Sequence, residues 1–144
     1  HIEQKDLARK YSSEIHANEI ILLAYYIAAV NIESVFGSIN NGLYKPFDGL
    51  VLTDTFQMFE SDDIMDEMVF QDNNAKVSKQ KNTDIRVVIG NPPYSKGQSD
   101  ANQDNPNMKY PDLDDSIRQT YVRHSKSALS NSSYDSYFKA FRWA

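Results

Sequence analysis

The stretch Ile85-Arg86-Val87-Val88-Ile89-Gly90-Asn91-Pro92-Pro93-Tyr94 decides the fold that we predict for this chain. Its first part, 85–89, is a short apolar run of the kind that forms a buried strand. The two prolines must end such a strand, because proline has no N–H for the ladder and pushes the preceding residue into extended geometry. The stretch therefore predicts a strand at 85–89 that enters a stiff loop at 91–94.

This loop places an amide, a rigid carbonyl and an aromatic ring together at the carboxyl end of a strand. Open α/β sheets bind their ligands at that end. The side-chain oxygen of Asn91 and the carbonyl of Pro92 form a pair of acceptors for an exocyclic amino group, and the ring of Tyr94 can stack on a flat substrate. The arrangement suits methyl transfer to an amino nitrogen on a planar group.

The rest of the chain alternates helical and strand-like patterns. Helices are predicted at 1–11, 20–34, 59–70, 112–125 and 133–144, and strands at 14–18, 49–53 and 85–89. The polar runs 71–83 and 95–112 are predicted to be loops, the second of them mobile. The helix at 20–34 is apolar all round and is expected to be buried, whereas the acidic helix at 59–70 is expected to be exposed. Alternating strands and helices predict a parallel α/β sheet.

Asn91-Pro92-Pro93-Tyr94 after a strand resembles the catalytic motif of S-adenosylmethionine-dependent amino methyltransferases, above all the N6-adenine DNA methyltransferases. The resemblance implies a Rossmann-like sheet with parallel strands and flanking helices. It also implies catalytic positions at Asn91, Pro92, Pro93 and Tyr94. The alternative interpretation of the four residues is a rigid turn that carries a surface tyrosine.

Two acidic residues upstream occupy positions that the same family uses for its cofactor. Glu19 follows the predicted strand at 14–18, where a carboxylate can accept both ribose hydroxyls, as in dinucleotide folds. Asp54 ends the strand at 49–53, where the resemblance implies a contact with the cofactor adenine. The alternatives are a carboxylate at a helix N-terminus for Glu19 and a turn or helix cap for Asp54. The order of Glu19, Asp54 and the Asn91 motif is that of the gamma-type enzymes.

Longer stretches resemble the single-polypeptide Type I restriction-modification enzymes, which join a nuclease, a helicase-like motor, a methyltransferase and a target-recognition domain. These stretches are 18–33, 90–98, 134–137 and 142–144. The resemblance covers nearly all of the chain but only part of one domain. It implies that 1–144 is a partial methyltransferase domain with the second to fourth strands and their helices. The first strand and the glycine-rich cofactor loop are missing, and the chain has only five glycines.

The resemblance implies that the intact parent moves a methyl group from S-adenosylmethionine to a flipped adenine in double-stranded DNA. The fragment alone is expected to be inactive, and its exposed sheet edges suggest a homodimer. Two alternatives stay open. One is an amino methyltransferase that acts on release-factor glutamine or RNA guanine, and the other is a non-catalytic scaffold.

Composition bears on DNA binding, metal binding and membrane contact. The chain has 144 residues and a net charge of −5, and this net charge does not indicate a DNA-binding protein. Basic residues nevertheless cluster around the predicted catalytic strand. It has no cysteine and three scattered histidines, so no metal site is predicted, and His16 is expected to be a packed core residue. No signal peptide is recognised, and the apolar run from Ile20 to Val30 is too short to cross a bilayer. We expect a bacterial cytoplasmic protein without membrane contact.

Overall fold

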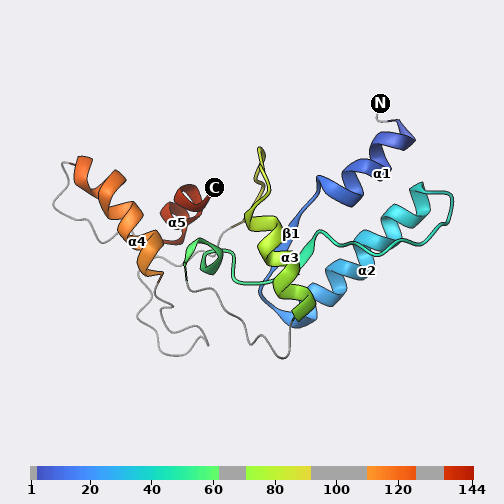
Figure 1. Ribbon diagram of the computed structural model, residues 1–144, viewed down its shortest axis with the longest axis horizontal. Helices are drawn as coiled ribbons and strands as arrows, with labels where there is room; N and C mark the ends of the chain where they lie inside the picture. The colour runs from blue at the N-terminus through green and yellow to red at the C-terminus, as the bar shows by residue number, and fades with distance from the viewer. Residues whose placement is uncertain (1–2, 62–70, 92–109, 126–134) are drawn as a thin grey trace. The chain divides into compact units, whose positions relative to one another are not determined.

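The computed structural model describes residues 3–61, 71–91, 110–125 and 135–144 (Figure 1). These residues belong to two units, and each unit is described by itself. Described residues of the first unit come from His1–Met58 and Ile64–Thr83, and those of the second from Phe59–Asp63 and Asp84–Ala144. The predicted helix at 59–70 and the predicted mobile loop at 95–112 lie almost entirely outside the described residues.

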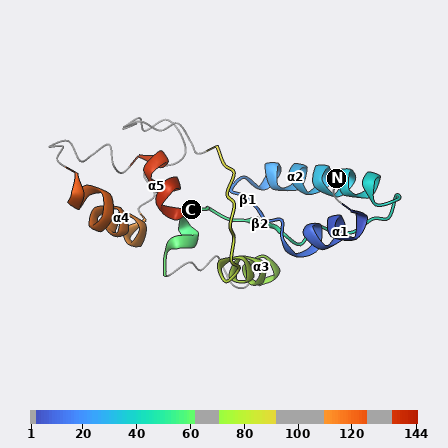
Figure 2. The same ribbon diagram turned by 90° about the horizontal axis from the view of Figure 1, so that it is seen from above.

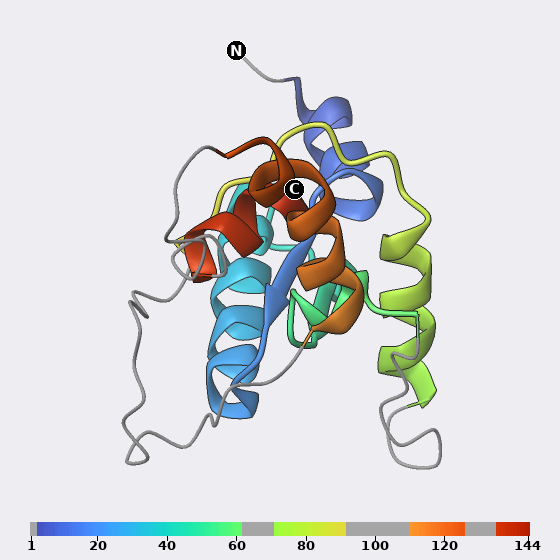
Figure 3. The same ribbon diagram turned by 90° about the vertical axis from the view of Figure 1, so that its left-hand side faces the viewer.

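The first unit is built on two short parallel strands. Strand β1 (Ala17–Glu19) pairs with β2 (Leu50–Leu52), with Ala17 opposite Leu50 and Glu19 opposite Leu52. Helix α2 (Leu22–Ile39) and helix α3 (Gln71–Lys81) lie on opposite sides of these strands (Figure 2 and Figure 3). The parallel α/β arrangement predicted from the sequence is therefore confirmed for these two strands.

Helix α1 (Gln4–Ser13) closes the core of this unit. The ring of Tyr11 stacks on Phe36 with 3.6 Å between the ring centroids, and the Tyr11 hydroxyl donates to the carbonyl of Lys45 at 2.9 Å. A glycine is required at position 49, because a Cβ there would lie 2.2 Å from the carbonyl oxygen of Ile15. The end of α1 and the start of β2 can approach closely only for this reason.

Helix α2 is longer and more exposed than the sequence predicts. Within it, Phe36 is buried, while Leu23, Tyr26 and Val30 are 69%, 59% and 66% exposed. The prediction of a buried helix at 20–34 is therefore wrong for the described chain. A sheet of two short strands covers one face of a helix, so the opposite apolar face of α2 remains in contact with solvent.

The length of α2 also bears on whether this apolar segment could cross a bilayer. Its 18 residues make it the one helix in the described residues that is long and apolar enough to cross a membrane, by length and composition. The expectation that the apolar run is too short does not hold, because the helix continues to Ile39. One face of α2 nevertheless packs against the core through Tyr25, Ala28, Ala29 and Ile32.

Helix α3 replaces a predicted loop at 71–83. The segment is too polar to show an apolar stripe, so the sequence pattern does not indicate a helix. In the structure its inward face consists of Asn73, Val77 and Gln80, which follow a spacing of four and three residues. Two amides and one valine anchor this helix to the sheet, and hydrogen bonds replace part of the usual apolar burial.

The second unit contains the helices predicted near the C-terminus. Helix α4 (Pro111–Ile117) continues into the π-helix η2 (Arg118–Val122), and α5 (Ser136–Trp143) packs against α4. Leu113 and Ile117 of α4 are fully buried. The predictions at 112–125 and 133–144 are confirmed in the described parts. A 3-10 helix, η1 (Gln57–Phe59), ends at Phe59, the first residue of this unit.

The predicted strand at 85–89 is not formed. Among the described residues nothing pairs with this segment, and Val87 and Ile89 are 75% and 95% exposed. The prediction of a buried strand is therefore wrong here. A strand in a parallel sheet needs hydrogen-bonding neighbours and helices on its faces, and apolar composition alone does not supply them.

Candidate cofactor site at the carboxyl end of the sheet

The two predicted cofactor carboxylates lie at the same end of the two-stranded sheet. Glu19 is the last residue of β1, and Asp54 follows β2 by two residues. The pairing extends past the strands, because the Thr53 N–H donates to the Glu19 carbonyl at 2.9 Å. Since β1 and β2 are parallel neighbours, their carboxyl ends present Glu19 and Asp54 at one edge, where α/β sheets bind ligands.

The Glu19 side chain accepts hydrogen bonds from the two residues that precede α2. Its Oε1 accepts from the backbone N–H groups of Ile20 at 2.9 Å and Ile21 at 3.1 Å. Both N–H groups precede Leu22, the first residue of α2. This position is compatible with the alternative of a carboxylate favoured near a helix N-terminus. It is also compatible with a ribose contact, because Oε2 accepts no hydrogen bond within the described part of the chain.

The Asp54 side chain organises the turn after β2. Its Oδ1 accepts from the backbone N–H of Phe56 at 2.9 Å, which is an Asx-type turn. The turn alternative for Asp54 is therefore present in the structure. The same bond holds the carboxylate at the carboxyl end of β2, in the place where an adenine contact is predicted.

A layer of amide side chains lies behind these carboxylates, and the sequence analysis missed it. The Asn73 side chain bonds to the backbone of Leu52 in both directions, and Gln80 bonds to Asn18. Reasoning from apolar periodicity overlooks such residues because they are polar. The signal that could have found them is the spacing of Asn73, Val77 and Gln80, which places all three on one helix face.

The structure does not test the predicted catalytic loop. Asn91 is described and exposed, whereas Pro92, Pro93 and Tyr94 lie outside the described residues. Asn91 belongs to the second unit, and Glu19 and Asp54 belong to the first. The assignment of the four loop residues to catalysis thus stays a prediction.

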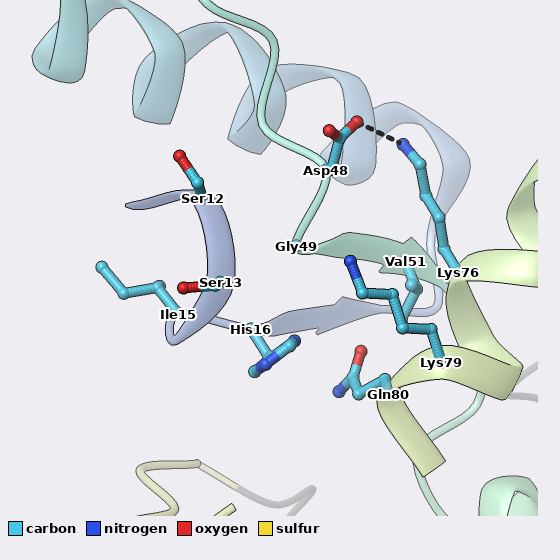
Figure 4. A pocket seen from close by; sticks show the side chains of 10 residues that line it. All are labelled: Ser12, Ser13, Ile15, His16, Asp48, Gly49, Val51, Lys76, Lys79 and Gln80. Carbon is cyan, nitrogen blue, oxygen red and sulfur yellow. Dashed lines mark ion pairs between the residues drawn. The ribbon is translucent and has the colours of Figure 1, made fainter. Parts of the chain in front are cut away.

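A small hollow lies at the opposite, amino end of the sheet (Figure 4). Its volume is about 20 Å³, and Lys76 forms an ion pair with Asp48 across 3.7 Å at its rim. A cofactor needs a cleft of about 300 Å³ or more, so this hollow holds a water-sized group at most. It is not the candidate cofactor site.

His16 lines this hollow and is half-buried, in partial agreement with the predicted packed histidine. Its Nε2 is buried and has no hydrogen-bond partner among the described residues. Burial lowers the pKa of the His16 imidazole, and the nearby Lys79 ammonium lowers it further. Both effects favour the neutral ring.

Comparisons with known proteins place the chain beside restriction-modification enzymes. No protein-family model and no curated protein matches it. Among solved structures, it is 47% identical, with a TM-score of 0.90, to a nuclease-deletion mutant of the Type ISP restriction-modification enzyme LlaGI in complex with a DNA substrate mimic. It is 43% identical, with a TM-score of 0.89, to the ATP-dependent Type ISP restriction-modification enzyme LlaBIII bound to DNA. A cryoEM structure of a DrdV–DNA complex follows at 35% identity and a TM-score of 0.85.

Each of these matches covers 99% of this chain but only a small part of the larger protein. The shares of the larger chains are 12% for LlaGI, 10% for LlaBIII and 14% for DrdV. The chain is therefore homologous, over nearly its whole length, to one short segment of Type ISP restriction-modification enzymes.

Proposed function

We propose that this chain is part of a DNA adenine N6-methyltransferase domain in a bacterial, cytoplasmic restriction-modification protein. The observation that carries the proposal is the 47% identity to LlaGI over 99% of the chain. The gamma-type order of Glu19, Asp54 and Asn91-Pro92-Pro93-Tyr94 supports it. The common edge occupied by Glu19 and Asp54 adds a geometric argument for one shared ligand.

S-adenosylmethionine is the cofactor of this proposal, and the residues at the sheet edge fit it. Glu19 has a carboxylate oxygen available for ribose hydroxyls, and Asp54 is held where it can accept from the adenine amino group. When bound, the cofactor supplies the methyl group. The residues for its methionine half are not identified in this chain.

The four residues 91–94 would act on the target base. An enzyme that modifies a base must first extrude it from the stack. The Asn91 side-chain oxygen and the Pro92 carbonyl would accept hydrogen bonds from the N6 amino group and raise the electron density on its nitrogen. Tyr94 would stack on the flipped ring. The N6 nitrogen would take the methyl group as the methyl–sulfur bond breaks and S-adenosylhomocysteine leaves, and the methylated amine would then release its proton to water, so no strong base would be required.

A methyl-transfer assay on the longer protein tests this proposal. Purified protein is incubated with labelled S-adenosylmethionine and, separately, an adenine-containing duplex, ribosomal RNA or a release factor. We expect label on the duplex, its loss in Asn91→Ala, and its retention in Asn82→Ala, which removes an exposed amide on another segment. Losing a preorganised acceptor costs on the order of 100- to 1000-fold in rate.

The same assay separates the alternatives. Label on RNA or on the release factor instead of the duplex would change the substrate within the methyltransferase class. DNA binding without transfer to any substrate would support a scaffold.

A homodimer is a further part of the proposal, because β1 has a neighbour on one side only in the described sheet and its other edge can pair.

A further inference from the structure

Two amide side chains on one face of α3, those of Asn73 and Gln80, bond to the two strands of the sheet. The backbone N–H of Leu52 donates to Asn73 Oδ1 at 2.8 Å, and Asn73 Nδ2 donates back to the Leu52 carbonyl at 2.8 Å. Gln80 Nε2 donates to Asn18 Oδ1 at 2.6 Å, and the Gln80 side chain is only 6% exposed. The helix therefore bonds to β2 through Asn73 and to β1 through Gln80.

Both contacts involve strand residues that are close in sequence to the cofactor carboxylates. Leu52 lies two residues before Asp54, and Asn18 immediately precedes Glu19. The amide of Asn18 also faces Thr55 Oγ1 at 3.4 Å, so it links β1 with the turn that contains Asp54. The hydrogen bonds of α3 thus reach the Leu52 backbone in β2 and the Asn18 side chain in β1, the two strands that end at the candidate site.

These hydrogen bonds fix the positions of the strand ends more than they add to the free energy of unfolding. Each strand has only three residues, so the ladder itself offers few hydrogen bonds to fix the strand ends. Asn73 acts like a short piece of a third strand, because it satisfies both outward-facing backbone groups of Leu52. A binding site needs its groups held to within about 0.5 Å, and surrounding hydrogen bonds supply that constraint.

We propose that Asn73 and Gln80 are positioning residues for S-adenosylmethionine binding. They would act through Leu52 and Asn18 and set the separation and direction of Asp54 and Glu19, so that both carboxylates meet one cofactor molecule. The inference rests on the proposed function.

The test uses the longer protein with Asn73→Ala and Gln80→Met, which remove the amides. Val77→Ala is the matched control, because Val77 is buried on the same face of α3 and makes no such bond through its side chain. Asn82→Ala controls for loss of an exposed amide. For each protein we would measure the cofactor Kd by calorimetry, the Kd for duplex DNA, the melting temperature and the single-turnover rate at saturating cofactor.

We expect Asn73→Ala and Gln80→Met to raise the cofactor Kd about tenfold, which corresponds to about 1.4 kcal/mol. DNA affinity and the rate at saturating cofactor should remain at the wild-type level. Val77→Ala should lower the melting temperature as much or more, yet leave the cofactor Kd unchanged. If Asn73 and Gln80 had only a structural role, the cofactor Kd would instead change in step with the melting temperature in all three variants.

Two results would overturn the inference alone. One is an unchanged cofactor Kd in both amide variants, and the other is a Val77→Ala protein whose cofactor Kd rises as much as theirs. Wild-type protein that binds no S-adenosylmethionine would instead overturn the proposed function, and the inference with it. The wild-type titration therefore distinguishes the two failures.

Discussion

At the scale of single residues, the candidate site depends on carboxylates that have structural duties of their own. One oxygen of Glu19 accepts from the two residues before α2, and Asp54 shapes its own turn. A residue that is already oriented by backbone N–H groups loses little side-chain entropy when a ligand binds. The backbone bonds of Glu19 and Asp54 are therefore compatible with the predicted ligand contacts.

The first prediction concerns these two carboxylates in the longer protein. Glu19→Ala and Asp54→Ala should weaken S-adenosylmethionine binding more than they slow the methyl-transfer step. A hydrogen bond to a charged group is worth about 1.5–3 kcal/mol, which corresponds to roughly tenfold or more in Kd. Calorimetric titration with the cofactor measures the Kd, and single-turnover kinetics measures the transfer step. An unchanged Kd in either variant would show that its assignment is wrong.

The second prediction concerns Tyr94. Tyr94→Ala should reduce methylation severely, whereas Tyr94→Phe should be mild, because stacking on a base is worth about 1–3 kcal/mol and needs only the ring face. Single-turnover transfer to an adenine-containing duplex is the measurement. An equal loss of the methyl-transfer rate in the two variants would mean that the hydroxyl of Tyr94, and not its ring face, is required.

At the scale of elements, the second unit depends on a buried acid. Glu60 is 5% exposed, and its two carboxylate oxygens accept from the backbone N–H groups of Asp112 at 2.9 Å and Leu113 at 3.1 Å. These groups lie in the first turn of α4, where N–H groups lack partners within the helix. An acid remote in sequence thus does the work of a local helix cap.

The third prediction follows from this contact. Glu60→Ala should lower the free energy of unfolding of the second unit by about 1–2 kcal/mol, the usual cost of losing a helix cap. Urea denaturation followed by the fluorescence of Trp143, the single tryptophan and a residue of α5, reports on this unit. Asp84→Ala is the control, since its ion pair with Arg86 is highly exposed and contributes little. A stability loss as large in the control would contradict the capping role.

The fourth prediction is a pH dependence. The Ser61 hydroxyl and then its backbone N–H donate to Asp112, and these bonds lower the pKa of the Asp112 carboxyl below its usual value. A lowered folded-state pKa favours the charged form, so the stabilisation is present above the unfolded pKa of about 3.9. It is lost as pH falls through the lower folded pKa.

This dependence is tested by denaturing wild-type protein and Asp112→Asn at pH 6 and pH 3 and following Trp143 fluorescence. The two pH values bracket the usual Asp pKa of about 3.9. We expect the stability difference between the two proteins to shrink at the lower pH. A difference that is the same at both values would rule out a contribution from Asp112 ionisation.

At the scale of the whole molecule, many large apolar side chains of the described residues are exposed. The outward face of α2 carries Leu23 and Val30, and the segment 84–90 carries Val87 and Ile89, all more than half exposed. Large exposed apolar patches mark interaction surfaces. In the solved structures that resemble this chain, the matching segment is one part of a much longer polypeptide.

The fifth prediction is that the 144-residue chain self-associates. Sedimentation velocity over a range of concentrations should show reversible association, and the double variant Leu23→Lys/Val30→Lys should weaken it, because charges oppose burial of the α2 face. Ser34→Lys adds a charge at an exposed polar position of the same helix and serves as the control. A chain that stays monomeric at every concentration would refute the prediction. Association that persists in the double variant would point to the open edge of β1 instead.

The sequence by itself determined the parallel pairing of β1 and β2, the helices α1, α2, α4 and α5, and the resemblance to restriction-modification enzymes. These features depend on local apolar patterns and on motifs that are contiguous in the chain. It also located Glu19 and Asp54 at strand ends, and the structure puts them at one edge of the sheet.

Only the tertiary structure decided the rest. Helix α3 forms because Asn73 and Gln80 find backbone and amide partners on strands far away in the sequence, which no local pattern reveals. The run 85–89 is apolar and strand-like, yet it forms no strand in the described residues, because a strand exists only through its neighbours. Local composition sets what a segment can become, and long-range hydrogen bonds decide whether it does.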